Sequence, residues 1–177
     1  MNDNTLVKYT MTYGLYLGIA FSAVVMILKF AGNIHFPGDT AGMINAMLLS
    51  VGMVYFGRKY RDTLHKGEFL YKSALGFSVL LTLFSAIIYT FFSYWYYTVI
   101  EPNGISYYIE QMHLAYTQNG TFSDEQLSAL VDLYNNMLTP GIMAFIVFFS
   151  QSLIGVLLGL VMSVFIKSPV RIEQNNY

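Results

Sequence analysis

Four long runs of apolar residues, separated by polar segments, dominate the pattern of the chain. They cover residues 9–30, 40–56, 72–97 and 141–166, and the second run is the shortest and least hydrophobic. A transmembrane α-helix needs about 20 mostly apolar residues, because it must cross a hydrocarbon core of roughly 30 Å. The pattern therefore predicts an all-α membrane protein with four transmembrane helices in a single domain that covers residues 1–177.

The segment between the third and fourth runs, about residues 101–139, has its own pattern. Apolar residues recur there at helical spacing in two stretches, and Asn119 and Gly120 between them mark a turn. Ser123 followed by Gln126 matches a capping box at the start of a helix. We therefore expect an amphipathic helical hairpin. Its two apolar stripes are Ile105, Tyr108, Ile109, Met112 and Tyr116, then Leu127, Leu130, Val131, Tyr134 and Met137.

Charge gives this arrangement a direction, because cytoplasmic loops carry an excess of Lys and Arg. With four spans, the basic residues near span ends fall on one side, except for Lys29. The predicted hairpin contains acidic residues and no Lys or Arg. Both termini are therefore expected in the cytoplasm and the hairpin outside it. Lys29 lies about one turn from the outer end of its span, where it can reach water or pair with Asp39 or Glu101.

Composition strengthens the membrane prediction and removes several classes of chemistry. Hydrophobic residues make up 55% of the chain and charged residues 11%, against roughly 25% charged in typical soluble proteins. The net charge of −1 gives no reason to expect a nucleic-acid partner, and the absence of cysteine removes thiolate chemistry. The three histidines lack metal-ligand spacing, and we find no nucleophile motif, phosphate loop or pair of catalytic carboxylates. We expect no metal, no cofactor and no enzymatic activity.

Polar residues inside the predicted spans form the first candidate site. In lipid, such side chains seek hydrogen-bond partners across helices, and each bond contributes about 1 kcal/mol. Helix–helix packing is one explanation of these residues, and a buried polar site is the other. The patch consists of Asn45 in the second span and Ser150, Gln151 and Ser152 in the fourth, where it is densest.

A basic cluster after the second span also has two interpretations. It can act as a determinant of topology, or it can bind anionic lipid head groups or a cytosolic partner. Its members are Arg58, Lys59, Arg61 and Lys66.

Two pairs of glycines, Gly14 with Gly18 and Gly155 with Gly159, match the close-packing motif of membrane helices. The motif brings two helices together either inside one bundle or between a bundle and a partner. The sequence alone leaves both arrangements open.

The run from residue 55 to residue 102 resembles a family of small bacterial membrane proteins; it reads YFGRKYRDTLHKGEFLYKSALGFSVLLTLFSAIIYTFFSYWYYTVIEP. The family is the domain of unknown function 4199, found chiefly in Bacteroidota. The similarity includes the basic connector, the aromatic end of the third span and the final span that ends at Lys167, and it covers about residues 5–168. The resemblance implies four spans in the bacterial inner membrane. It also implies an association with lipid-linked sugar metabolism, and it supplies no catalytic residues.

Two functions follow as hypotheses. The first is a non-enzymatic accessory or scaffold protein of the bacterial envelope, which the close-packing glycines and the amphipathic hairpin favour. It would act as a homo-oligomer or within a larger membrane complex. The alternative is a small oligomeric transporter or flippase for lipids or lipid-linked substrates, which would need a path through the bundle.

Overall fold

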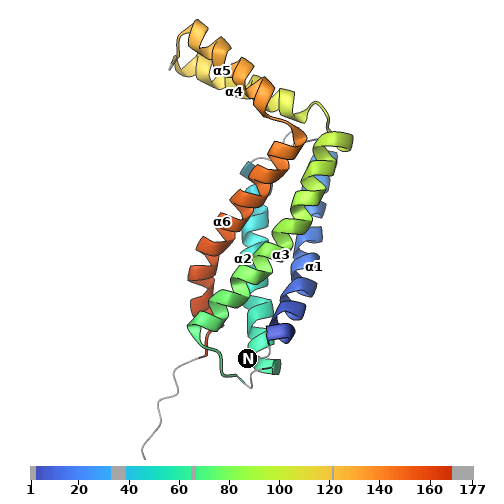
Figure 1. The fold of residues 1–177 in the computed structure, drawn as a ribbon, viewed down its shortest axis with the longest axis vertical. Coiled ribbons are helices and arrows are strands. Elements are labelled where there is room, and N and C mark those ends of the chain that lie inside the picture. Colours follow the sequence, from blue (N-terminus) through green and yellow to red (C-terminus); the bar gives the residue numbers. More distant parts are fainter. Residues whose placement is uncertain (1–2, 33–38, 65–66, 121, 169–177) are drawn as a thin grey trace, which may run out of the picture.

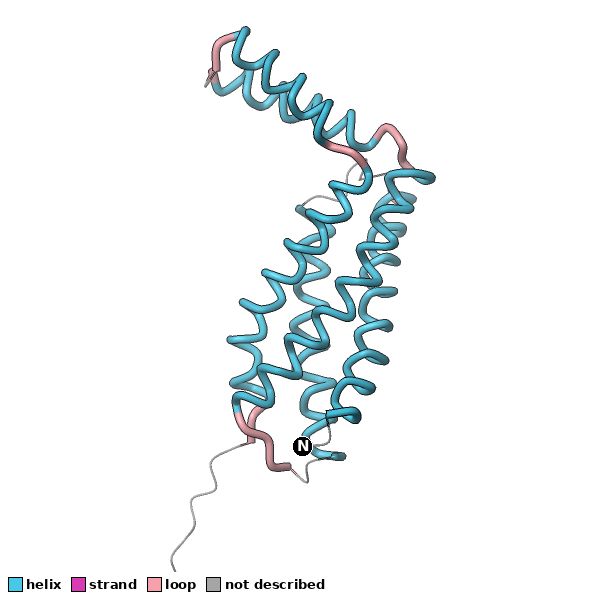
Figure 2. The backbone as a smooth tube through the Cα atoms, in the orientation of Figure 1, coloured by secondary structure: helices cyan, strands magenta, loops and turns pink. Residues whose placement is uncertain are grey.

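The computed structural model describes residues 3–32, 39–64, 67–120 and 122–168. In these residues every regular element is helical, and no strand is present (Figure 2). Four helices are long and apolar enough to cross a membrane, which confirms the predicted spans. These four are α1 (Asp3–Phe30), α2 (Asp39–Leu64), α3 (Tyr71–Trp95) and α6 (Pro140–Ile166). Between α3 and α6 lie the π-helix η1 (Tyr96–Ile100), α4 (Gly104–Asn119) and α5 (Asp124–Met137).

The four long helices form a bundle in which each helix packs on two neighbours (Figure 1). Helix α3 packs mainly on α1 and α6, and α2 packs on the same two helices from the opposite side, with little contact between α2 and α3. We call the end with the start of α1 and the end of α6 the terminal end, and the end next to α4 and α5 the distal end (Figure 1). Helices α1 and α3 run toward the distal end, whereas α2 and α6 run back.

The second span is longer than its apolar run indicated. Helix α2 continues past Phe56 to Leu64, so Arg58, Lys59 and Arg61 lie on a helix and not in a connector. Lys and Arg are good helix formers, and Gly57 inside this stretch lies against the Ile166 side chain of α6. Contact with α6 therefore supports about two further turns of α2, which hydropathy alone does not predict.

Close contact through glycine holds α1 and α6 against α3. A Cβ atom at Gly14 would lie 2.6 Å from Phe84 Cβ, and one at Gly18 would lie 2.6 Å from Ile88 Cβ. On the other side of α3, Gly155 lies directly against the Thr82 side chain. Gly159 faces Ser78 at 3.2 Å from the ideal Cβ position. Both glycine pairs therefore pack inside the bundle and are not free for a partner helix.

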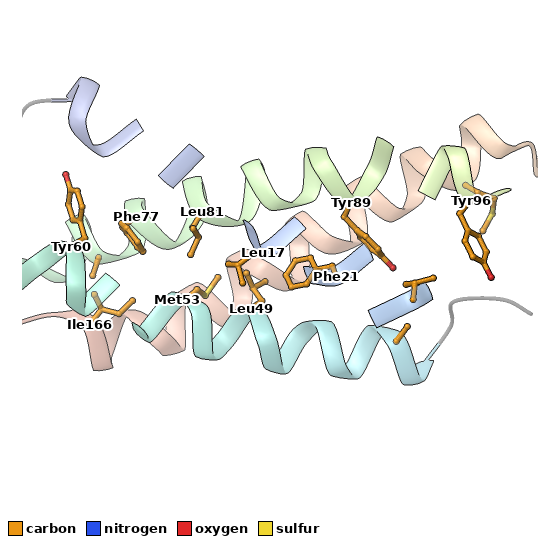
Figure 3. Close-up of a cluster of buried hydrophobic side chains, with 14 of the residues drawn as sticks. Leu17, Phe21, Leu49, Met53, Tyr60, Phe77, Leu81, Tyr89, Tyr96 and Ile166 are labelled. Carbon is orange, nitrogen blue, oxygen red and sulfur yellow. The ribbon is translucent and has the colours of Figure 1, made fainter. Parts of the chain in front are cut away.

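The core between the helices is rich in aromatic side chains (Figure 3). Toward the terminal end, the ring of Tyr60 lies 5.5 Å from that of Phe77, and toward the distal end, Phe21 lies 6.0 Å from Tyr89 in an edge-to-face arrangement. Such aromatic pairs add to the stabilisation that comes from burial. The η1 turn then brings both Tyr96 and Tyr97 into the core.

Helices α4 and α5 pack against each other at the distal end, and we refer to them as the α4–α5 pair. The chain turns after α4 at Gly120, whose φ of +60° suits glycine. The capping box predicted for Ser123 and Gln126 is present at the start of α5. Ile105, Ile109 and Leu127, all from the two predicted stripes, are buried. The pair leans away from the bundle axis (Figure 2).

Candidate functional site

The predicted polar patch is divided by the structure. Asn45 is fully buried in the core, whereas Gln151 and Ser152 are half-buried on α6 and Ser150 is exposed on its outer side. Because α2 and α6 run in the same direction, their register can be followed from one contact. Met53 lies against the position of Gly159, and Asn45 precedes Met53 by as many residues as Gln151 precedes Gly159. Asn45, Gln151 and Ser152 therefore lie at about the same depth in the bundle.

The buried polar atoms at this depth are largely without hydrogen-bond partners. Both amide atoms of Asn45, the Gln151 Nε2 and the Ser152 Oγ make no hydrogen bond to the described residues. The Tyr89 phenol lies close enough to Asn45 for an electrostatic interaction, but not in the geometry of a hydrogen bond. An unpaired polar group in an apolar interior costs about 1–3 kcal/mol. These amide and hydroxyl atoms therefore have hydrogen-bonding capacity that the described residues leave unused.

The sequence analysis missed three further polar side chains, which lie farther along α3 and η1, toward the distal end. The Thr90 Oγ1 and the Tyr96 hydroxyl are also buried and make no hydrogen bond within the described part of the chain. The hydroxyls of Tyr89 and Tyr96 point to the same side of α3 and η1 (Figure 3). Their spacing of seven residues, two helical turns, is the pattern that would have grouped them. None of these side chains titrates near neutral pH, so the layer offers hydrogen bonding and no proton relay.

Three serine and threonine side chains in the spans bond to their own helix and not across helices, contrary to expectation. Ser50 donates to the Ala46 carbonyl at 2.8 Å, Thr82 donates to Ser78 at 2.9 Å, and Ser85 donates to Thr82 at 2.8 Å. A hydroxyl that bonds to a carbonyl three or four residues earlier is satisfied locally. These hydroxyls therefore supply small, close-packing surfaces and contribute nothing to the unpaired layer.

The described members of the basic cluster at the terminal end make different contacts. Arg58 Nε donates to the Phe165 carbonyl at 3.0 Å, and Arg61 donates to the carbonyls of Ile166 and Lys167 at 3.0 and 3.2 Å. These carbonyls end α6, where a helix leaves acceptors unpaired and favours positive charge. The arginines therefore cap α6. Lys66 lies outside the described residues.

Arg61 is fully engaged, because it also forms an ion pair with Asp62 at 2.7 Å. To the residues that the structure describes, Lys59 makes only weak polar contacts: its Nζ lies 3.5 Å from the Tyr13 hydroxyl and 5.7 Å from the centre of the Tyr13 ring. Lys59 is exposed, and so is most of Arg58. Of the three members that the structure describes, these two side chains face an open surface.

That surface is a groove between α2 and α6 with a volume of about 630 Å³. Its walls are mostly apolar, and its two charged residues lie at the terminal end. It is lined by Ser50, Val51, Val54, Tyr55, Arg58, Lys59 and Met162. We call it the α2–α6 groove.

A second ion pair among the described residues is at the distal end, where Lys29 contacts Glu101. Glu101 was one of the two partners considered for Lys29; the side chain of Asp39, the other, lies outside the described set. Among the described residues, no three His, Asp or Glu side chains come together in a way that could hold a metal ion.

Comparison with known proteins adds a family and no further relative. No curated protein and no solved structure matches the chain. A family model described as "Protein of unknown function (DUF4199)" matches residues 12–168, a range that includes nearly all of the four long helices and the whole α4–α5 pair. The chain therefore belongs to the DUF4199 family.

Proposed function

We propose that this protein is a non-enzymatic accessory protein of the bacterial inner membrane, and that its α4–α5 pair contacts a partner on the extracytoplasmic side. The observation that carries the proposal is the position of this pair, which stands off the distal end of the bundle (Figure 1). Apolar side chains stay exposed on it, among them Leu114, Leu133 and Met137. Exposed apolar surface that a fold does not use for its own packing favours a binding role.

The charge distribution supports the direction of this contact. Lys8, Arg58 and Lys72 belong to the terminal end, whereas the stretch from residue 101 to residue 139 has no Lys or Arg. Basic residues are retained on the cytoplasmic side. The α4–α5 pair would then be an extracytoplasmic amphipathic hairpin with an acidic polar face, carrying Glu110, Asp124, Glu125 and Asp132.

Lipid transport receives less support as an alternative. A lipid carrier needs a route across both leaflets, and the α2–α6 groove extends along only part of α2, from Ser50 to Lys59. Toward the distal end, the interior is filled by aromatic side chains such as Phe21, Tyr89 and Tyr96. This geometry favours a packed membrane anchor over a transport path. The resemblance makes a membrane enzyme of lipid-linked sugar metabolism the first partner to test.

Site-specific photo-crosslinking in native membranes tests the proposal. A crosslinking amino acid at Leu133 should capture one defined membrane protein, and the same group at Phe91, an exposed position on α3, should capture lipid. Leu133→Glu should reduce co-purification of the captured protein at least fivefold, with Ser128→Glu on the same helix as the control. Equal capture from both positions, or no effect of Leu133→Glu, would contradict the accessory role.

The orientation can be tested separately, because the chain has no cysteine. Single cysteines at Leu64 and Tyr107, both exposed, should react differently with a reagent that does not cross the membrane. In intact spheroplasts the cysteine at position 107 should be labelled and the one at position 64 protected. The reverse pattern would invert the topology.

A further inference from the structure

We propose that the α2–α6 groove binds one anionic phospholipid of the cytoplasmic leaflet. Its phosphate would lie between Arg58 and Lys59, and one acyl chain would lie along Val51, Val54 and Met162. The choice of leaflet rests on the orientation proposed above, whereas binding itself rests on the groove alone. The inference adds a ligand to the bundle, which is separate from the partner proposed for the α4–α5 pair.

The length of the groove fits one acyl chain. Its lining on α2 runs from Ser50 to Lys59, which corresponds to about 14 Å along a helix that rises 1.5 Å per residue. One leaflet contributes about half of a hydrocarbon core that is roughly 30 Å thick. At the deep end, the Ser50 hydroxyl already donates to Ala46, so the groove offers an apolar surface to the chain there.

The terminal end of the groove fits a phosphate. Arg58 uses its Nε for the Phe165 carbonyl at 3.0 Å, and this bond fixes the guanidinium at the mouth of the groove. A guanidinium has five N–H donors, and the other four have no acceptor among the described residues. Lys59, the next residue of α2, adds a second exposed positive charge to the groove lining. Two cations at the membrane surface complement the negative charge of anionic lipid head groups.

The structure also excludes one member of the predicted basic cluster, Arg61, from the proposed lipid site. Arg61 is not part of the groove lining, and its donors are used by Asp62 and by the carbonyls of Ile166 and Lys167. Its role is the closure of α6, and its replacement would disturb the fold and the groove together. Lys59 is the better test position, since its only contacts to described residues are the weak ones with Tyr13.

Native mass spectrometry of the full-length protein in detergent, titrated with phosphatidylglycerol or with phosphatidylcholine of the same chain length, tests this site. Wild type should bind one phosphatidylglycerol at least fivefold more tightly than phosphatidylcholine, because each cation near a lipid surface contributes roughly fivefold. Lys59→Glu should remove this preference. Lys8→Glu, an exposed lysine of α1 outside the groove, should keep it.

A second pair of variants tests the acyl chain. Val51→Trp fills the groove and should weaken binding of both lipids, whereas Met47→Trp changes an exposed residue of the same helix outside the groove and should leave binding unchanged. Equal affinity for the two lipids in wild type would overturn the proposal. So would equal effects of Val51→Trp and Met47→Trp, or a dimer that Val51→Trp dissociates. None of these outcomes depends on partner capture by the α4–α5 pair or on labelling from one side.

Discussion

Lys29, near the distal end of α1, forms an ion pair with Glu101, the residue that follows η1. The two side chains are 23% and 17% exposed, so the pair is partly shielded from water. It connects α1 to the chain at the point where the bundle ends and the connection to α4 begins. The end-of-span lysine thus has a structural role, as a contact that fixes how the chain leaves α3.

Removal of one partner should leave the other charge partly buried and unpaired. We expect Lys29→Ala and Glu101→Ala each to lower the free energy of unfolding by about 2 kcal/mol, the usual effect for a hydrogen bond to a charged group. The double variant should be destabilised less than the sum of the two. Thermal unfolding in detergent measures this cycle, with Lys8→Ala as a control for loss of positive charge. Strict additivity would show that the two residues act independently.

The contact between Gly155 and Thr82 sets the distance between α6 and α3. A Cβ atom at position 155 would overlap the Thr82 side chain, and overpacking of this kind costs about 1–3 kcal/mol. Gly155→Ala should therefore destabilise the protein by that amount in a detergent unfolding assay. Thr82→Ala in the same chain removes the two nearest atoms and should restore part of the loss.

Gly76 on α3 provides the matched control, since no atom lies within 4 Å of its ideal Cβ position. Ala forms helix more readily than Gly by about 1 kcal/mol. Gly76→Ala should therefore be neutral or stabilising. A similar loss of stability from Gly76→Ala and Gly155→Ala would mean that close packing is not the cause.

The sequence predicted features that depend on short stretches of chain. The four spans follow from apolar length, and the cap at Ser123 follows from two residues that are three positions apart. The continuation of α2 to Leu64 does not follow from the sequence, because it is supported by contacts of Gly57, Arg58 and Arg61 with α6, far along the chain. Hydropathy could not indicate a helix whose support comes from another element.

In the candidate sites, too, the sequence predicted individual residues but not the contacts between distant elements. The cations of the α2–α6 groove were visible in the sequence, but Met162 joins them only when α6 lies beside α2. Nothing in the sequence singled out Tyr89 and Tyr96, because their burial depends on packing and on the η1 turn. Sites made from two helices need the register between those helices, and apolar sequences define that register weakly.

The cap of α5 is a test of local stability. The Ser123 Oγ accepts a hydrogen bond from the backbone N–H of Gln126, and the Gln126 Oε1 accepts one from the backbone N–H of Ser123. Ser123→Ala removes the first bond and should destabilise the helix by about 1 kcal/mol. Hydrogen exchange at the amides of the first turn of α5 should become about fivefold faster. Ser128→Ala in the middle of α5 is the control and should change exchange little; equal effects would argue against the cap.

Substitution of Asn45 tests whether a residue can lower stability and still be needed for function. Its side chain is 1% exposed, and neither amide atom makes a hydrogen bond to the described residues. An amide left in that state costs about 1–3 kcal/mol. Asn45→Leu replaces the amide with an apolar group of similar size and should raise the unfolding temperature in detergent. Met47→Leu, at an exposed position of α2, should leave it unchanged.

A residue that destabilises its own fold is a candidate for function, because sequences depart from good packing mainly at functional sites. Asn45→Leu should therefore raise the stability of the bundle and reduce the activity of the protein in its native membrane. If the asparagine had a purely structural role, the same substitution would lower both the stability and the activity. If Asn45→Leu lowered the unfolding temperature, the amide would have to be satisfied in the native membrane protein by water or a ligand. Measurement of the unfolding temperature and the phenotype on the same variant distinguishes these outcomes, since a destabilised variant and a stable but inactive one differ in the first measurement.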